Sequence, residues 1–171
     1  NAQDGGNRSF ILIEMMDYAE TITAERVRRV MSGYGEGSKR TEGLGGGFTY
    51  HTIGEPLFLP DDNLNEAVGA EEIRKYVTWT ESIPVNEQTT PNNPHTPYLL
   101  GINPDTAWIF NYEPDRATCL DMDFLASLKF GGATAAPKPN TVIIYADRCL
   151  LSKDFMTKHG IIFKKIPRDI T

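Results

Sequence analysis

The sequence is poor in the side chains that most often bind metals or carry thiol chemistry. Among 171 residues it holds two cysteines, Cys119 and Cys149, and three histidines. Neither cysteine lies in a C-x-x-C pair, and none of these side chains has metal-ligand spacing relative to another. We therefore expect no metal site, and we expect both cysteines to be reduced, structural thiols.

Long apolar runs are also missing. No stretch approaches the roughly 18 apolar residues that a membrane-spanning helix requires, and residues 1–7 are polar, unlike a secretory signal. Hydrophobic residues make up 40% of the chain and charged residues 23%, which is typical of a globular protein. We therefore expect a cytoplasmic globular chain without a membrane partner, comprising one domain or one domain and part of another.

Positive charge is scarce. The formal net charge is -6, which disfavours an autonomous DNA-binding domain, because neutralising phosphates takes clustered lysine and arginine. The charge is also uneven, since residues 55–87 are strongly acidic and residues 145–171 carry more bases than acids. Solvated surfaces explain most such differences. A basic surface over residues 145–168 that contacts nucleic acid is the alternative, and the sequence leaves it open.

Hydrophobic patterns predict an α/β fold with a mixed sheet, in which helices pack on the sheet. A C-terminal β-α-β unit, with a helix ended by Gly160, should have parallel strands and a right-handed crossover. An antiparallel hairpin is predicted at residues 98–112. The predicted strands cover residues 10–13, 48–53, 98–102, 107–112, 141–145 and 161–166, and the predicted helices cover residues 17–31, 70–80 and 152–159, with another that Asp121 caps.

A glycine-rich stretch divides the chain. Residues 33–47 hold seven glycines, which is typical of a flexible connection. The spacing matches neither a phosphate-binding P-loop nor a dinucleotide-binding turn, because each motif lacks a required glycine. The predicted organisation is therefore residues 1–33, a linker at 34–47, and an α/β domain at 48–171.

Two acidic residues follow predicted strands. Glu14 comes directly after residues 10–13, which read as a strand buried on both faces of a parallel sheet. An acid at that position can accept hydrogen bonds from both hydroxyls of a ribose. Asp147 follows the strand at 141–145, where a local turn or cap is the more common role. By contrast, Arg26, Arg28 and Arg29 fit an ion-paired helix surface with Glu25.

The segments DGGNRSFILIE at residues 4–14 and ETITAERVRRV at residues 20–30 resemble the Mod subunits of type III restriction–modification systems. Those proteins are β-class DNA methyltransferases that use S-adenosylmethionine to methylate adenine N6. A weaker similarity extends through residues 47–50, 98–112 and 141–166. The resemblance implies that residues 1–33 are the tail of a Rossmann-like methyltransferase domain, that residues 48–171 are a C-terminal accessory domain, and that Glu14 is a ribose ligand.

The family's catalytic Asp-Pro-Pro-Tyr segment is absent from this sequence, as are its glycine-rich cofactor turn and its DNA-recognition region. We therefore expect no catalytic residue in the chain, no methylation by the chain alone and no binding of S-adenosylmethionine without the rest of the enzyme. The segment that distinguishes adenine N6 from cytosine N4 specificity in the family is this same absent catalytic segment. The expected partners are DNA through the upstream region, the remaining methyltransferase, the restriction subunit and a second copy.

A different class of function is also compatible with the sequence. A free-standing α/β protein or enzyme that binds a small nucleotide would place Glu14 and Asp147 in one crevice. That arrangement is the alternative hypothesis to the methyltransferase fragment.

Overall fold

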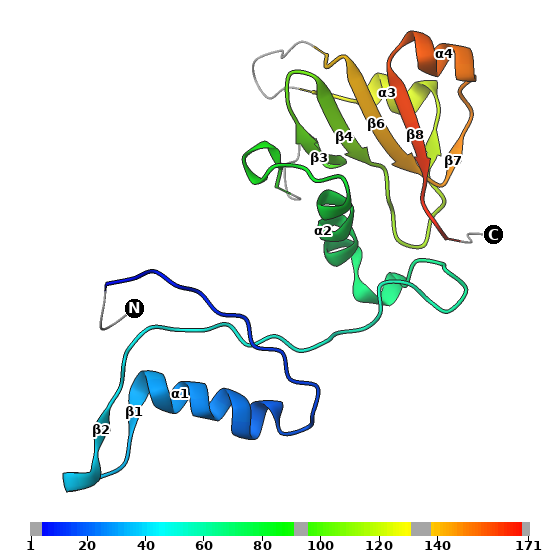
Figure 1. The fold of residues 1–171 in the computed structure, drawn as a ribbon. Coiled ribbons are helices and arrows are strands. Elements are labelled where there is room, and N and C mark those ends of the chain that lie inside the picture. Colours follow the sequence, from blue (N-terminus) through cyan, green and yellow to red (C-terminus); the bar gives the residue numbers. More distant parts are fainter. Residues whose placement is uncertain (1–4, 91–95, 131–137, 169–171) are drawn as a thin grey trace. The chain divides into compact units, whose positions relative to one another are not determined.

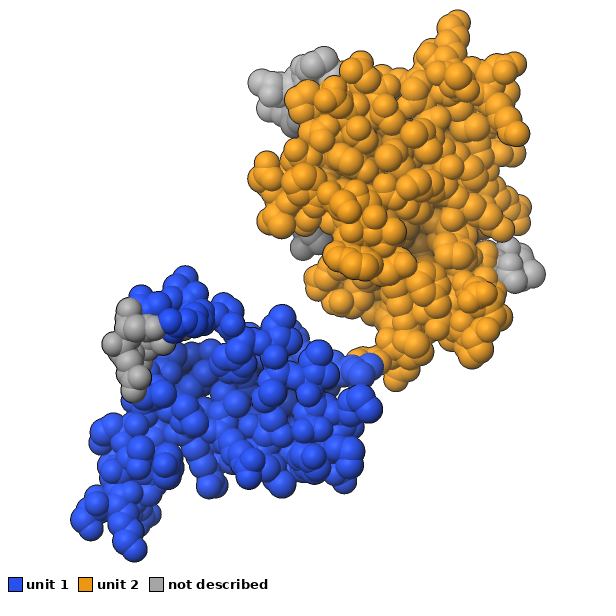
Figure 2. All heavy atoms as spheres, in the orientation of Figure 1, with its two compact units in different colours: residues 1–53 blue, residues 54–171 orange. Residues whose placement is uncertain are grey.

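The computed structural model describes residues 5–90, 96–130 and 138–168. The chain forms two compact units, Asn1–Ile53 and Gly54–Thr171, which we call unit 1 and unit 2 (Figures 1 and 2). Within the described ranges, no helix is both long enough and apolar enough to cross a membrane.

Unit 1 is built around one helix, which confirms the helix predicted at residues 17–31. It starts with π-helical turns, η1 (Ala19–Ala24), and continues as α1 (Glu25–Ser32). Glu25 pairs with Arg28 and with Arg29, as the spacing predicts. Gly33 ends the helix with a φ of 86°, a conformation that glycine adopts without steric cost.

A small hairpin follows the helix. Strand β1 (Gly33–Tyr34) pairs antiparallel with β2 (Thr41–Glu42), and the 3-10 turn η2 (Gly37–Lys39) lies between them. A Cβ atom on Gly43 would lie 2.2 Å from the Met31 carbonyl oxygen, so only glycine fits against the helix end. Residues 34–47, the predicted linker, therefore include a hairpin folded against α1, and the two units meet between Ile53 and Gly54.

The two strands predicted in unit 1 do not form. Residues 10–13 and 48–53 lie in no sheet, and Ile11 and Ile13 are 92% and 84% exposed. A parallel strand needs a neighbouring strand to satisfy its backbone, and the described part of unit 1 offers only the two-residue strands β1 and β2. These predictions are wrong for the isolated unit. An apolar run indicates a strand that pairs with other strands, and the described part of unit 1 contains no strand with which it pairs.

The described part of unit 1 also lacks a hydrophobic core of its own. Of its hydrophobic side chains that the structure describes, only Ala24 is buried. The exposed apolar side chains include Phe10, Ile11, Leu12, Ile13, Met15, Met16, Ile22 and Val30.

Unit 2 contains the mixed sheet and confirms the predicted fold class (Figure 1). Its strand order is β3 (Leu99–Ile102), β4 (Thr106–Phe110), β6 (Thr141–Ala146) and β8 (Ile161–Lys165). Strands β3 and β4 form the antiparallel hairpin, whereas β4, β6 and β8 run parallel. A second, unpredicted pair is β5 (Cys119–Leu120) with β7 (Arg148–Cys149), which is also parallel.

Local sequence signals set the ends of the helices of unit 2. Helix α2 (Ala70–Thr80) matches the prediction and buries Ile73 and Val77. Helix α3 (Met122–Ser127) starts at Asp121, whose carboxylate accepts from the Phe124 amide at 2.8 Å. Helix α4 (Lys153–Lys158) is capped by Ser152 and lies between β6 and β8, which completes the β-α-β unit. Two further 3-10 turns are η3 (Glu66–Val68) and η4 (Val85–Glu87).

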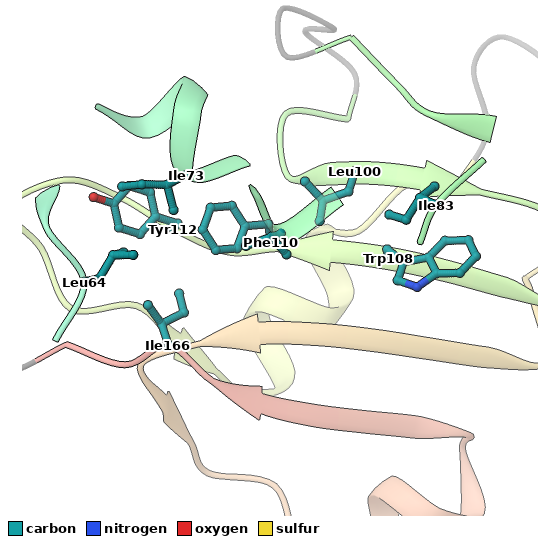
Figure 3. Close-up of a cluster of buried hydrophobic side chains, with 9 residues drawn as sticks. Leu64, Ile73, Ile83, Leu100, Trp108, Phe110, Tyr112 and Ile166 are labelled. Carbon is teal, nitrogen blue, oxygen red and sulfur yellow. The ribbon is translucent and has the colours of Figure 1, made fainter. Parts of the chain in front are cut away.

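The sheet separates two buried clusters. On the face toward α2, Ile73 and Val77 pack with Leu100, Trp108, Phe110 and Ile166 (Figure 3). On the other face, β6 contributes Val142, Ile144 and Ala146, and helices α3 and α4 add partly buried side chains. Fully buried and partly buried side chains therefore alternate along β6. This pattern is expected of a strand whose two faces are both covered, one more completely than the other.

A buried acid fixes the end of α2 to the sheet. The Glu81 carboxylate, whose side chain is 7% exposed, accepts hydrogen bonds from the Tyr145 hydroxyl and the Lys164 ammonium. Tyr145 and Lys164 are register partners on β6 and β8. One helix terminus is thus tied to two parallel strands.

Candidate functional site at the carboxyl edge of the sheet

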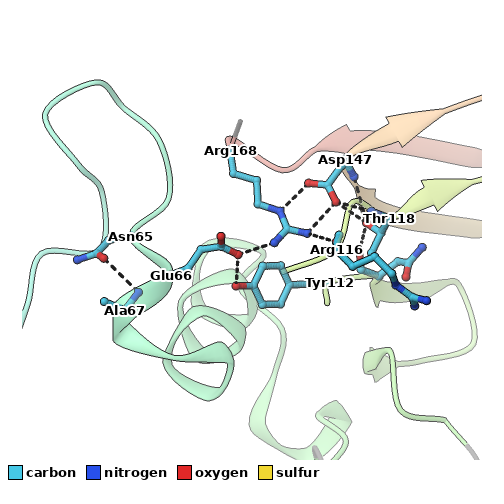
Figure 4. A network of polar contacts seen from close by, with 9 residues as sticks. Asn65, Glu66, Ala67, Tyr112, Arg116, Thr118, Asp147 and Arg168 are labelled. Carbon is cyan, nitrogen blue, oxygen red and sulfur yellow. Dashed lines mark hydrogen bonds and ion pairs between the residues drawn. The ribbon is translucent and has the colours of Figure 1, made fainter. Parts of the chain in front are cut away.

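Polar residues gather where the three parallel strands of unit 2 end. Asn111 follows β4, Asp147 follows β6 and Arg168 lies three residues after β8. The carboxyl edge of a parallel sheet is where α/β proteins usually bind ligands. Five side chains form what we call the Arg168 cluster: Glu66, Tyr112, Thr118, Asp147 and Arg168 (Figure 4).

The centre of the cluster is a buried, bidentate ion pair. Arg168 Nε donates to Asp147 Oδ1 at 2.7 Å, and Arg168 Nη2 donates to Asp147 Oδ2 at 2.8 Å. The two side chains are 2% and 7% exposed. Two parallel hydrogen bonds between ions are among the strongest polar contacts in proteins.

The remaining partners surround this pair. Arg168 Nη1 donates to Glu66, and Nη2 also donates to the Arg116 carbonyl oxygen at 3.0 Å. The guanidinium carbon lies 4.4 Å from the Tyr112 ring centroid, and the Tyr112 hydroxyl donates to Glu66 at 2.7 Å. Glu66 at the start of η3 is thereby joined to the C-terminal segment.

Asp147 is equally occupied. Its Oδ2 accepts from the Thr118 amide at 2.6 Å and from the Thr118 hydroxyl at 2.8 Å. Burial on its own would raise the pKa of Asp147, but the hydrogen bonds from Arg168 and Thr118 together hold that pKa below its ordinary value. An acid that is ionised and bound on both oxygens is a poor proton acceptor, so this geometry does not make Asp147 a general base.

The cluster closes this edge of the sheet. Ile166 is 1% exposed within the core, the Pro167 carbonyl accepts from the Leu64 amide at 2.7 Å, and Arg168 joins Glu66 to Asp147. The chain after β8 therefore fastens the η3–α2 segment to the sheet. We assign the Arg168 cluster a structural role, since its charged groups already have partners.

Acid should destabilise unit 2 through Asp147. A folded-state pKa below the unfolded value of about 3.9 adds stability that is full above that value and is lost as pH falls through the folded pKa. We expect the denaturant midpoint to fall steeply below about pH 4. The measurement is urea unfolding between pH 7 and pH 2.5, and Asp147→Asn should flatten the acid limb. An unchanged acid limb in that variant would contradict the assignment.

Glu14 lies in unit 1, whereas Asp147 lies in unit 2. The Glu14 carboxylate accepts from the amides of Met15 and Met16, at 3.0 Å and 3.2 Å. It is exposed and lies directly after residues 10–13, just before the bend at Met16, with no further hydrogen-bond partner among the described residues.

The described histidines and cysteines show no catalytic arrangement. Both cysteines are free and half-buried, and burial is the main cause of a raised pKa at Cys119, which disfavours the reactive thiolate. His159 packs its ring 4.3 Å from that of Phe155, and His95 lies outside the described residues. No group of three potential metal ligands occurs in residues 5–90, 96–130 and 138–168.

No family model, curated protein or solved structure matches this chain.

Proposed function

We propose that this chain is the C-terminal part of an S-adenosylmethionine-dependent DNA adenine-N6 methyltransferase of a restriction–modification system. In this proposal unit 2 serves assembly or structural support, and catalysis and DNA recognition belong to the upstream region. The observation that carries the proposal is the exposed apolar run at residues 10–13. It has the sequence of a buried strand, it resembles the family's second cofactor-binding strand, and nothing in the described part of unit 1 covers it.

The weak packing of unit 1 supports the idea that residues 10–13 pair with a sheet of another domain. An eight-residue α-helix is marginal in water without tertiary packing, and the described part of unit 1 buries a single hydrophobic side chain. Burying a side chain such as Ile11 or Ile13 contributes roughly 1.5 to 3 kcal/mol. Pairing residues 10–13 with another strand would therefore supply the energy that unit 1 lacks.

Glu14 has a defined role in such a sheet. When residues 10–13 pair with the central strands of the methyltransferase domain, Glu14 stands at the carboxyl edge of that sheet. Its carboxylate then accepts hydrogen bonds from the two ribose hydroxyls of S-adenosylmethionine. It is exposed in the chain alone and bonded only to neighbouring backbone amides, so it is free to turn toward a cofactor.

Unit 2 fits a supporting role. Its two charged clusters, around Arg168 and around Glu81, hold helix α2 and the C-terminal segment to the sheet. A rigid module of this kind suits contact with the methyltransferase core, with a second copy or with the restriction subunit.

Two measurements test the proposal together. Calorimetry with S-adenosylmethionine at millimolar concentration should show no binding to the 171-residue chain, because Glu14 is only one part of the cofactor site. Binding that is lost in Glu14→Ala would overturn the idea of a half-site.

The second measurement uses the protein that carries this chain in its source cells, captured with an antibody against unit 2. We expect ultraviolet light to cross-link radiolabelled S-adenosylmethionine to the captured polypeptide, and we expect methyl transfer to DNA adenine. A captured polypeptide that neither cross-links to S-adenosylmethionine nor methylates DNA would contradict the proposal. If such a polypeptide binds adenosine monophosphate, the result would favour the free-standing nucleotide-binding alternative.

A further inference from the structure

A second feature of unit 2 is a groove that shares no lining residue with the Arg168 cluster. It is a groove of about 610 Å³ between helix α2 and the segment at residues 82–89, a volume in the range of small-molecule sites. Its floor includes Ile83 and Leu100, which belong to the buried cluster of Figure 3. Apolar contact surface at the rim comes from Trp79 and Val85, which are 76% and 85% exposed.

One wall of this groove carries a cation without an acidic partner. Arg74 is half-buried, and it donates to the Leu99 carbonyl, the Thr89 hydroxyl and, at 3.5 Å, the Pro97 carbonyl. No carboxylate pairs with it among the described residues. A guanidinium has five N–H donors, so this arrangement leaves donors unused.

The acidic residue that lines the same groove does not pair with Arg74. Glu71 also lines the groove, but it pairs with Lys75 at 3.3 Å. Burial lowers the pKa of Arg74 and no neighbouring charge offsets that shift, which is the mark of a partly desolvated cation without a counter-charge. A partly buried charge normally finds an opposite one.

We propose that this groove binds an anion attached to a flat apolar group, with Arg74 contacting the carboxylate or phosphate and Trp79 covering the apolar ring. Arginine matches both kinds of anion through paired N–H donors, and an exposed indole offers a stacking surface. This site does not depend on the methyltransferase proposal, because it lies within unit 2 and uses none of the residues assigned to S-adenosylmethionine.

Nuclear magnetic resonance of the isotope-labelled chain tests the site with four probes: benzoate, phenyl phosphate, acetate and neutral benzyl alcohol. The two tryptophans make a matched pair of reporters, because Trp79 is exposed in the groove and Trp108 is buried in the core. We expect the aryl anions to shift the Trp79 indole signal saturably, with a dissociation constant on the order of 1 mM, and to leave Trp108 unmoved. The ratio of benzoate to phenyl phosphate affinity distinguishes a carboxylate ligand from a phosphate ligand.

Two variants separate the contributions. Arg74→Gln should weaken aryl-anion binding roughly tenfold and bring it to the level of benzyl alcohol. Because Arg74 also donates a hydrogen bond to the Leu99 carbonyl, the spectrum of its variant must match the wild-type spectrum outside the groove.

Trp79→Ala changes an exposed side chain, so it should keep the fold. It should weaken the binding of the aryl anions to the level of acetate, as read from the Thr78 and Thr89 amides. Arg116→Gln, at a 73% exposed cation of unit 2, is the control and should bind as the wild type does.

Benzyl alcohol binding as tightly as benzoate would overturn the role of Arg74, and acetate binding as tightly as benzoate would overturn that of Trp79. The site itself is overturned if no aryl anion shifts Trp79, or if both variants bind as the wild type does.

Discussion

Arg168→Met is expected to destabilise unit 2 by about 3 to 5 kcal/mol, because removing one partner leaves a buried carboxylate without its counter-charge. Arg168 is 2% exposed and binds Asp147, Glu66 and the Arg116 carbonyl. Methionine is shorter than arginine but unbranched and similar in volume, so the loss reports on charge and hydrogen bonding more than on volume. Urea unfolding of the chain, followed by circular dichroism, measures the change, because unit 2 contains the four-stranded sheet and three of the four α-helices that the structure describes.

Arg116→Met is the matched control. It removes an arginine whose side chain is 73% exposed and pairs with Glu113 at 3.8 Å, so we expect a change within about 0.5 kcal/mol. The double variant Arg168→Met with Asp147→Leu should recover part of the lost stability, because it removes the unpaired charge as well. Equal effects of Arg168→Met and Arg116→Met would show that the Arg168 cluster does not hold the fold.

We expect the chain to self-associate through the apolar run of unit 1, and charges placed on that run should weaken this association. Ile11 and Ile13 are 92% and 84% exposed, and adjacent exposed apolar side chains promote association. We expect Ile11→Asp with Ile13→Asp to weaken association by at least about tenfold for each residue. Sedimentation velocity over a range of protein concentrations measures the effect.

The control for that pair is Ile53→Asp, which changes a fully exposed isoleucine at the end of unit 1. It should leave association unchanged. The melting temperature of unit 2 should be the same in all three proteins. A wild-type chain that stays monomeric at the highest concentration would contradict the expectation that residues 10–13 seek a partner surface.

The parts of the fold that the sequence predicted are those with local signals. Ser152 and Gly160 mark the ends of α4, Asp121 caps α3, and the two apolar runs on either side of α4 form β6 and β8. The crossover then requires parallel pairing, which the register of Val142 with Ile161 confirms.

The parts that the sequence did not predict depend on distant residues. The Arg168 cluster joins Arg168 to Glu66, 102 positions away, and no local pattern announces that pair. The pair β5–β7 is two residues long on each side, too short for a periodic pattern to show. The strand predicted at residues 10–13 was wrong for the opposite reason. The local pattern is clear, but the described part of unit 1 has no sheet for that strand to join.

The role of Asp147 shows how position alone can mislead. The sequence placed it at the carboxyl end of a strand, and either a crevice or a local turn was compatible with that position. The structure gives neither, because Asp147 binds Thr118 and Arg168, which are 29 and 21 positions away. A buried charge is explained by its partners, and here the two partners come from two separate segments of the chain.

Hydrogen exchange on the dilute, monomeric chain tests most directly whether unit 1 needs the sheet of another domain. We expect the amides of α1 and of residues 10–13 to exchange nearly as fast as in an unfolded peptide, and those of β6 to exchange only through unfolding of unit 2. Protection of α1 and residues 10–13 equal to that of β6 would show that unit 1 is stable on its own. That result would contradict the proposal that it is completed by a methyltransferase domain.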